Sequence, residues 1–505
     1  MSSPLISRLF QLRSSRRDAI VHEGCGRSFT DLLDRAVTIA GRLRTEAGVE
    51  HGQRVAILAS PSAPWVEAYL AVILAGGIAV PLSPSYPPVE LAWFADDADA
   101  TAVIYSADQA ERAAAMLKGR VALRIEDLDR DAAKRTDATL PMLDAEDIAL
   151  LLYTSGTTGK PKGAMITHAN VAIQAEIMRE AWSFSPSDTL LHALPLHHLH
   201  GLGISMMTSL LSGATTRMLP KFEAARVWDE IASGGVTVWM AVPTMYQKLF
   251  EALDAAPPDV AERWKKGASA LRLATSGSAA LPVRLAERWR AITGAIPLER
   301  FGMTEIGVGL TNPLTPSDRR PGWVGRPPRT VEICIVDEDR RVITSGAGEL
   351  LVRGPSVFKG YFRRPEATES AFASGWFLTG DRAERDETGA VRLLGRTSVD
   401  ILKSGGEKLS ALEIEETLRE HTAVREVAVV GLPDETWGER VVAAIVAEPG
   451  RETELTTDAV RAWSKERMAP YKAPREVVLM PSLPRNALGK VVKPELIAHL
   501  KSRAI

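Results

Sequence analysis

Residues 54 to 106 alternate between short apolar runs and segments of helical periodicity, and this alternation limits the possible fold more than any other feature. The predicted elements are strands over 54–60, 78–82 and 101–106, with helices over 63–75 and 88–97. Strand–helix–strand order of this kind gives parallel sheets with right-handed crossovers. Similar alternation recurs around 189–196, 237–241 and 271–276. The sequence therefore predicts a layered α/β body.

A change of pattern near residue 396 divides the predicted fold in two. The chain has 505 residues, which exceeds the usual size of one domain. Beyond residue 396 the predicted elements are a helix over 412–421, strands over 427–432 and 441–447, a helix over 458–468 and a strand over 475–480. We therefore expect a large body of parallel sheets flanked by helices over 1–395 and a small, mobile α+β domain over 396–505.

A loop rich in glycine and hydroxyl groups follows the apolar run from Ile148 to Leu152. Its sequence is Tyr153-Thr154-Ser155-Gly156-Thr157-Thr158-Gly159-Lys160-Pro161-Lys162-Gly163. Glycines let backbone N–H groups approach a phosphate, hydroxyls donate further hydrogen bonds, and lysines add positive charge. The loop is thus predicted to bind a polyphosphate, close to a helix N-terminus if the next helix opens near Thr167. A flexible surface loop is the alternative, because linkers use the same residues.

The loop is not a Walker A motif, because Thr154 stands where that motif has its first glycine. It closely resembles the signature loop of the adenylate-forming superfamily, which includes acyl-CoA synthetases, peptide-synthetase adenylation domains and firefly luciferase. The resemblance covers roughly residues 15 to 500. It implies that ATP binds at Thr154, Ser155, Gly156, Thr157, Thr158, Gly159 and Lys160.

Further motifs of this superfamily imply the rest of the nucleotide site. The adenine would lie against Gly277, Ser278, Ala279, Phe301 and Gly302. Most members carry Tyr at the position of Phe301, and phenylalanine keeps the stacking face. The carboxylate of Asp381, which can only accept hydrogen bonds, would bind the ribose hydroxyls. Arg396 would contact the same ribose.

The segment Glu299-Arg300-Phe301-Gly302-Met303-Thr304-Glu305 is another match. The resemblance implies that Thr304 hydrogen-bonds the α-phosphate and that Glu305 holds Mg²⁺, a cation that prefers oxygen ligands. The segment Leu194-Pro195-Leu196-His197-His198-Leu199-His200 ends in a histidine cluster. One interpretation of this cluster is a zinc site. The resemblance instead places His198 beside the substrate carboxylate and the pantetheine, in a positional and steric role.

The C-terminal region carries three more matches. Lys490, in Asn486-Ala487-Leu488-Gly489-Lys490, corresponds to the lysine that reaches into the active site for adenylation. Ser398 holds the hinge position that is usually Asp or Lys, and Asp400 is near it, so either residue is a candidate pivot. Lys403, Ser404, Gly405 and Gly406 resemble the loop that lines the coenzyme A tunnel in this superfamily. The implied reaction joins an acid to AMP and then, after rotation of the small domain, to coenzyme A.

Two basic residues suggest that the acid is a short dicarboxylate. Arg300 and Lys248 are expected near the acyl pocket, where a second substrate carboxylate would need a cation. The alternatives are that Arg300 pairs with Glu299 or another acidic neighbour, and that Lys248 is a solvated residue on a helix face. Because several segments resemble malonyl-CoA and methylmalonyl-CoA synthetases, we predict malonate, with methylmalonate as a second candidate. The rivals are a ligase for a monocarboxylic fatty or aromatic acid, an enzyme that loads a separate carrier protein, and a non-catalytic sensor.

The overall charge argues against nucleic acid or a membrane surface as the main partner. The formal net charge is −2, with no long run of one sign. The two cysteines fit a reducing compartment, and no apolar run approaches the roughly 20 residues of a membrane span. We predict a cytoplasmic location. Residues 1–17 carry a faint transit-peptide pattern, which leaves the mitochondrial matrix as the alternative, but an ordinary basic first helix is favoured.

Overall fold

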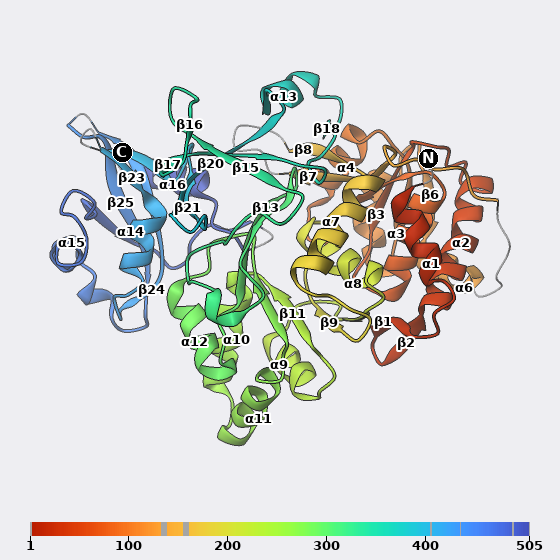
Figure 1. Ribbon diagram of the computed structural model, residues 1–505, viewed down its shortest axis with the longest axis horizontal. Coiled ribbons are helices and arrows are strands. Elements are labelled where there is room, and N and C mark those ends of the chain that lie inside the picture. Colours follow the sequence, from red (N-terminus) through yellow and green to blue (C-terminus); the bar gives the residue numbers. More distant parts are fainter. Residues whose placement is uncertain are drawn as a thin grey trace.

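The computed structural model describes residues 3–132, 139–154, 161–404, 407–434, 436–486 and 489–503. These residues form four sheets with helices packed around them (Figure 1). In the first sheet the strand order is β14-β13-β12-β11-β9-β10-β1-β2. Its strands are β1 (Asp18–His22), β2 (Cys25–Ser28), β9 (Thr189–His192), β10 (Thr215–Met218), β11 (Val238–Ala241), β12 (Leu273–Ser276), β13 (Leu298–Met303) and β14 (Gly307–Thr311).

In the second sheet the strand order is β18-β8-β7-β4-β3-β5-β6. Its strands are β3 (Arg54–Leu58), β4 (Ile78–Pro81), β5 (Ala100–Tyr105), β6 (Val121–Arg124), β7 (Ile148–Thr154), β8 (Lys162–Thr167) and β18 (Gly360–Tyr361). Strand β3 pairs in parallel with both β4 and β5, as the alternation in the sequence predicts.

The third sheet is antiparallel and also precedes residue 396, so parallel sheets alone do not describe the N-terminal part. It consists of β15 (Glu332–Val336), β16 (Val342–Ile343), β17 (Gly346–Arg353), β19 (Phe372–Ala373), β20 (Trp376–Arg385) and β21 (Val391–Arg396). The fourth sheet comes from β22 (Ile401–Ser404), β23 (Glu407–Ser410), β24 (Val424–Asp434), β25 (Gly438–Ala447) and β26 (Glu476–Leu479).

The helices cover the sheets, and in Figure 1 the fourth sheet with its helices forms the blue region at one side. The α-helices of the described residues are α1 (Pro4–Leu12), α2 (Phe29–Thr45), α3 (Ala63–Leu74), α4 (Pro88–Asp97), α5 (Ala110–Ala113), α6 (Ile125–Ala132), α7 (His168–Ala181), α8 (Met207–Leu211), α9 (Ala224–Ala232), α10 (Pro243–Ala255), α11 (Pro258–Ala268), α12 (Val283–Thr293), α13 (Pro365–Ser370), α14 (Ala411–Leu418), α15 (Thr457–Lys465) and α16 (Lys493–Arg503). The predicted fold class, a large α/β body with a smaller α+β unit, is confirmed.

The fourth sheet has apolar clusters of its own on both faces. One cluster gathers side chains of β22 to β25 with those of α14 and α15, and the other packs β24 and β25 against α16. Side chains of the other three sheets pack in two further clusters. Because an apolar core is what stabilises a domain, the C-terminal unit has a core of its own.

The predicted helix N-terminus near the phosphate loop is wrong, although the helix itself is where the sequence places it. Thr167 caps α7 by accepting a hydrogen bond from the backbone N–H of Asn170. Strand β8 intervenes, however, and runs antiparallel to β7 with Thr154 opposite Lys162 and Thr167 opposite Ile148. The start of α7 therefore lies roughly 17 Å from Lys162, at the far end of β8.

Four neighbouring parallel strands of the first sheet, β9, β11, β12 and β13, end at one edge. The segments that follow or complete them carry much of the predicted chemistry: His197 to His200 after β9, the start of α10 after β11, Gly277 after β12, and Arg300 to Glu305 at the end of β13. The carboxyl edge of a parallel sheet is the usual ligand-binding position in α/β folds.

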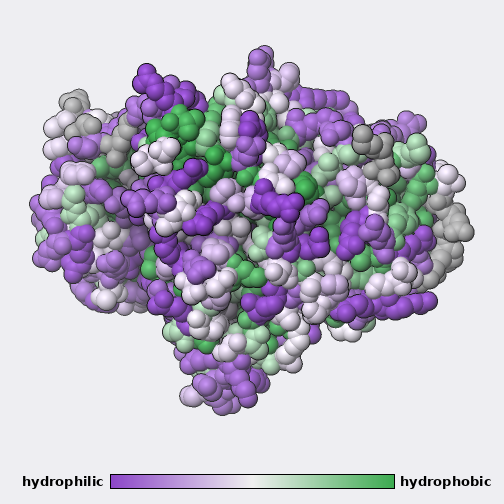
Figure 2. All heavy atoms as spheres, viewed as in Figure 1, coloured by the Kyte–Doolittle hydropathy of each residue, from purple (hydrophilic) through white to green (hydrophobic). Residues whose placement is uncertain are grey.

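The described helices include none that is both long and apolar enough to cross a membrane. Helix α1 buries Leu5 and Leu9 in the main apolar cluster, so residues 4–12 pack as a first helix. On the face drawn in Figure 2, hydrophilic and hydrophobic residues are interspersed.

Candidate active site

The two ends of the predicted phosphate loop are fixed by neighbouring strands. Thr154 ends β7 and its hydroxyl donates to the carbonyl of Lys162, at 3.4 Å, at the start of β8. The hydroxyl of Tyr153 donates to Asp97, at 2.9 Å, and Arg364 pairs with the same carboxylate. Of the predicted loop residues, Ser155, Gly156, Thr157, Thr158, Gly159 and Lys160 lie outside the described residues.

Arg300 lies in the sheet beside Gly277, because Ser276 of β12 pairs with Glu299 of β13. A Cβ atom added to Gly277 would be 2.5 Å from Cζ of Arg300, so only glycine leaves room for the guanidinium. Arg300 is 4% exposed, and its Nε and Nη2 atoms are buried without a hydrogen-bond partner among the described residues. Burial lowers the pKa of Arg300 to about 10, so the group stays charged at neutral pH. A buried unpaired cation is costly, and a bound anion would relieve that cost.

Glu299 does not pair with Arg300. Its carboxylate accepts a hydrogen bond from the backbone N–H of Gly322, at 3.0 Å. Burial raises the pKa of Glu299 to about 8, which makes the protonated, neutral form dominant at neutral pH. Glu299 and Arg300 are consecutive residues of β13, so their side chains point to opposite faces of the sheet, and no ion pair joins them among the described residues. The alternative of an Arg300–Glu299 ion pair is therefore wrong.

The histidine cluster lies at the same edge of the sheet. Nδ1 of His200 is 3.1 Å from the hydroxyl of Ser278, and the rings of His197 and His198 are 4.2 Å apart. Burial lowers the pKa of His198 to about 4 and that of His200 well below its usual value, the latter also because Arg300 is near. The rings are therefore neutral at neutral pH and suit a positional role better than proton transfer.

Thr304 and Glu305 occupy the turn of a tight hairpin between β13 and β14. Gly302 and Gly307 make the turn possible: a Cβ on Gly302 would lie 2.2 Å from the Gly307 carbonyl oxygen, and Gly307 has a φ of +70°. Phe301 is 8% exposed on β13, and Ala279 is exposed just beyond β12. The hairpin thus brings the predicted α-phosphate, metal and adenine residues to one end of the sheet.

No group of three or more His, Cys, Asp and Glu that could hold a metal ion occurs within the described ranges. This does not conflict with a magnesium site at Glu305, since Mg²⁺ is commonly bound by one or two carboxylates together with substrate phosphates and water. Glu305 is 5% exposed. One of its oxygens, Oε1, accepts a hydrogen bond from Tyr361, which leaves Oε2 without a donor among the described residues. The carboxylate therefore fits the predicted role.

Asp381 and Arg396 form an ion pair across two strands of the third sheet. Oδ1 of Asp381 is 3.0 Å from Nε of Arg396, whereas Oδ2 is buried without a partner among the described residues. Burial raises the pKa of Asp381 to about 6, while the charges of Arg396 and Lys490 oppose the rise. An unpaired, ionised oxygen at neutral pH is what a ribose hydroxyl needs from an acceptor.

Lys490 belongs to the C-terminal unit yet lies close enough to Asp381 and Arg396 for their charges to act on it. Its pKa is lowered mainly by burial and then by Arg396, although its surface still reaches solvent. Its loop contacts the N-terminal part, since a Cβ on Gly489 would lie 3.1 Å from Oγ1 of Thr244 on α10. The structure therefore brings the predicted adenylation lysine to the predicted ribose carboxylate.

The two candidate hinge residues, Ser398 and Asp400, differ in burial and in contacts. Ser398 is exposed, with no recorded contact in the described part of the chain, whereas Asp400 is buried. Oδ2 of Asp400 accepts from the backbone N–H of Arg396, at 2.9 Å, and Oδ1 is 2.5 Å from Nζ of Lys493. Nζ of Lys493 is also 2.7 Å from Glu415. Lys493 was not predicted from the sequence, because a lysine near a C-terminus is usually solvated. The only sequence feature that could have indicated it is its position three residues after Lys490.

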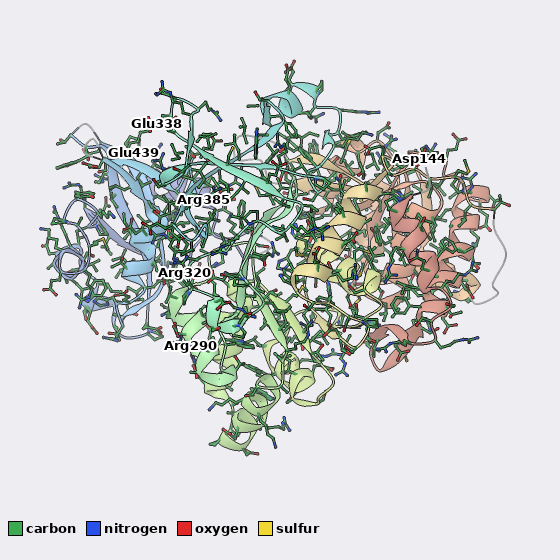
Figure 3. All side chains as sticks on the ribbon, viewed as in Figure 1. Asp144, Arg290, Arg320, Glu338, Arg385 and Glu439 are labelled. Atoms are coloured by element: carbon green, nitrogen blue, oxygen red, sulfur yellow. The ribbon has the colours of Figure 1, made fainter. Side chains whose placement is uncertain are left out.

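The predicted coenzyme A loop is only partly described, and Lys248 has no recorded contact with Arg300 among the described residues. Lys403 is exposed at the end of β22, where its backbone N–H donates to Glu439, which Figure 3 labels at the edge of the C-terminal unit. Ser404 is buried, and Gly405 and Gly406 lie outside the described residues. Lys248 is exposed on α10, and the structure records no contact between it and Arg300 in the described ranges.

Comparisons with known proteins agree with the resemblance to the adenylate-forming superfamily. The family described as AMP-binding enzyme matches residues 11–362, and its C-terminal domain matches residues 413–490. The chain is 39% identical to the mitochondrial malonate–CoA ligase of Mus musculus, with 96% of this chain and 88% of that one covered.

Two solved structures are also similar over most of their length. ATP-bound MatB from Rhodopseudomonas palustris is 34% identical, with a TM-score of 0.91 and 100% of each chain covered. A malonyl-CoA ligase in a ternary product complex with methylmalonyl-CoA and AMP is 37% identical, with a TM-score of 0.68 and 93% of this chain and 97% of that one covered. The chain belongs to the AMP-binding enzyme family.

Proposed function

We propose that this protein is an ATP-dependent malonate–CoA ligase, which forms malonyl-CoA through malonyl adenylate and releases pyrophosphate and AMP. The observation that carries the choice of acid is the buried, unpaired guanidinium of Arg300 at the carboxyl edge of the first sheet. A dicarboxylate could place one carboxylate on Arg300 and present the other to ATP, whereas a monocarboxylate would leave the cation unpaired. Relatives named for malonate–CoA ligation support this choice.

ATP and coenzyme A are the co-substrates that membership in a family of CoA ligases implies. The carboxylate of Asp381 and the guanidinium of Arg396 would hold the ribose, with adenine against Gly277, Ser278, Ala279, Phe301 and Gly302. Thr304 would bind the α-phosphate, together with the loop from Thr154 to Lys160. Glu305 would hold a magnesium ion, which would neutralise phosphate charge when bound.

The first half-reaction is the attack of a malonate oxygen on the α-phosphate, and both reactants are anions. Charge neutralisation and alignment therefore contribute more than a base would. Lys490 supplies an ammonium group from the C-terminal unit, close enough to Asp381 and Arg396 for their charges to act on its pKa. The neutral ring of His198 shapes the space beside the reacting carboxylate without exchanging a proton.

The second half-reaction needs Lys490 to leave, so we propose that the part of the chain beyond Ser398 rotates as a unit about this residue. Ser398 is exposed between Arg396, which ends β21, and Asp400, which pairs with Lys493 of the C-terminal unit. Lys493 also pairs with Glu415 of the same unit. The greater similarity to the ATP-bound structure than to the product complex supports an adenylation arrangement here, with TM-scores of 0.91 and 0.68. Rotation would bring Lys403, Ser404, Gly405 and Gly406 to the coenzyme A thiol. Lys248 and a cytoplasmic location remain predictions.

The test is product formation by the purified protein alone. With ATP, Mg²⁺, coenzyme A and malonate, we expect malonyl-CoA and AMP in equal amounts, and no need for a carrier protein. A panel with methylmalonate, acetate, butyrate and benzoate separates the rival acids. Faster turnover of butyrate or benzoate than of malonate would contradict the proposal, as would AMP release that is independent of coenzyme A.

A further inference from the structure

Tyr361 links the predicted metal carboxylate to the strand that leaves the phosphate loop. It lies on β18, where it pairs with Ala164 of β8. This pairing sets its ring 5.2 Å from Nζ of Lys162, the first residue of β8. On the other side, the hydroxyl of Tyr361 donates to Oε1 of Glu305, at 2.9 Å. One side chain therefore contacts both regions that are expected to surround the triphosphate.

The neighbourhood of Tyr361 holds its ring in place. Its backbone N–H donates to the hydroxyl of Thr368, at 2.9 Å, and the ring of Phe358 meets it edge-on with centroids 4.8 Å apart. The backbone N–H of Phe358 in turn donates to the carbonyl oxygen of Glu305, at 2.8 Å. Glu305 is thus held twice from the segment 358–361, once at its backbone and once at its carboxylate.

We propose that Tyr361 is a positioning residue that fixes the Glu305 carboxylate so that Oε2 faces a magnesium ion bound with ATP. The proposal rests on the metal role given to Glu305 under the proposed function. A hydroxyl that donates to one carboxylate oxygen limits rotation of the group and keeps its charge, which is how hydrogen-bonding partners commonly orient metal ligands. Through Lys162, which lies over the ring of Tyr361, the orientation of the Glu305 carboxylate is coupled to the end of the phosphate loop.

The decisive measurement is ATP binding by calorimetry without acid or coenzyme A, once with Mg²⁺ and once with EDTA. The ratio of the two dissociation constants reports how much the metal strengthens ATP binding. Tyr361→Phe removes only the hydroxyl, and we expect this ratio to fall by about tenfold, in line with the loss of other partners of metal ligands. The dissociation constant in EDTA should stay unchanged.

The matched control is Tyr69→Phe. Tyr69 is buried on α3, and its hydroxyl has no partner among the described residues, so its removal should leave both dissociation constants unchanged. Glu305→Gln should lower the ratio at least as far as Tyr361→Phe does. The double variant should bind like Glu305→Gln alone, because both changes act through one carboxylate.

Two results would overturn the inference, and they are distinguishable. If Glu305→Gln lowers the ratio and Tyr361→Phe leaves it at the wild-type value, Tyr361 does not position the carboxylate, while the proposed function stands. If Glu305→Gln itself leaves the ratio unchanged, the metal role of Glu305 fails, and the inference fails with it. A thermal unfolding scan of each variant shows that the comparison is made on folded protein.

Discussion

Gly277 and Arg300 face each other across neighbouring strands so closely that a Cβ on Gly277 would lie 2.5 Å from the guanidinium carbon. Gly277→Ala should therefore displace the guanidinium, and we expect the KM for malonate to rise by about tenfold or more, since roughly 1.4 kcal/mol of lost binding has that effect. ATP binding in the absence of acid is measured alongside, because Gly277 also belongs to the proposed adenine site, and the KM for malonate is compared at saturating ATP. An unchanged KM for malonate would show that Arg300 does not hold the substrate.

Lys490→Ala should separate the two half-reactions. Removing the ammonium group should slow malonate-dependent pyrophosphate release by about 100-fold or more, the usual effect of losing one electrostatic group at a transition state. Coenzyme A should still react with added malonyl adenylate at nearly the wild-type rate. Lys501→Ala, an exposed change on α16, is the control. Equal losses in both half-reactions would contradict the proposed role.

Asp381 predicts a pH effect on nucleotide binding. Its pKa is raised to about 6 by burial, so the carboxylate gains a proton as the pH falls through that value. A protonated group loses the charge that strengthens its hydrogen bonds to ribose, and ATP should therefore bind more weakly at pH 5 than at pH 8. Phosphate protonation also contributes, so the comparison is with Asp381→Asn, whose affinity should change less over the same range. Identical pH profiles would exclude Asp381 as the ribose acceptor.

Lys493 predicts a loss of stability that its position in the sequence does not suggest. Its ammonium group lies between Asp400 and Glu415, at 2.5 and 2.7 Å, and all three side chains are buried. Lys493→Met would leave two buried carboxylates without their cation, which we expect to lower the free energy of unfolding by about 3–5 kcal/mol. Urea denaturation measures this, with Lys501→Met as the exposed control. A loss no larger than the control's would mean that the ion pairs contribute little.

Local periodicity predicted the parallel strands well, because a buried run such as 148–152 or 54–58 needs only apolar composition and length to be identified. The antiparallel sheet of β15, β16, β17, β19, β20 and β21 was not predicted. Strand β20 alternates between buried and half-buried residues, but β15, β17 and β21 show no regular alternation. Strand β8 was missed for a related reason: Lys162 to Thr167 has only a weak apolar pattern and is ordered by β7.

Some residues named from motifs lie near one another although they are on different elements: Asp381 pairs with Arg396, and the charges of both act on Lys490. The sequence could not show that Arg300 would be unpaired, because the adjacent Glu299 is an acidic residue with which it could form an ion pair. Only the packed strands show that Glu299 bonds to Gly322 instead. Tyr361 and Lys493 escaped prediction because their roles are contacts with residues far away in sequence.

The central claim is that a second carboxylate on the acid binds Arg300. Its most direct test is the ratio of kcat/KM for malonate to that for propionate, which has a methyl group in place of one carboxylate. The account predicts a ratio of about 100 or more in the wild type, because a buried charge pair is worth roughly 2–5 kcal/mol. The ratio should fall towards one in Arg300→Ala and stay high in Arg290→Ala, a change on the exposed surface of α12. A wild-type ratio near one, or a high ratio that survives Arg300→Ala, would contradict it.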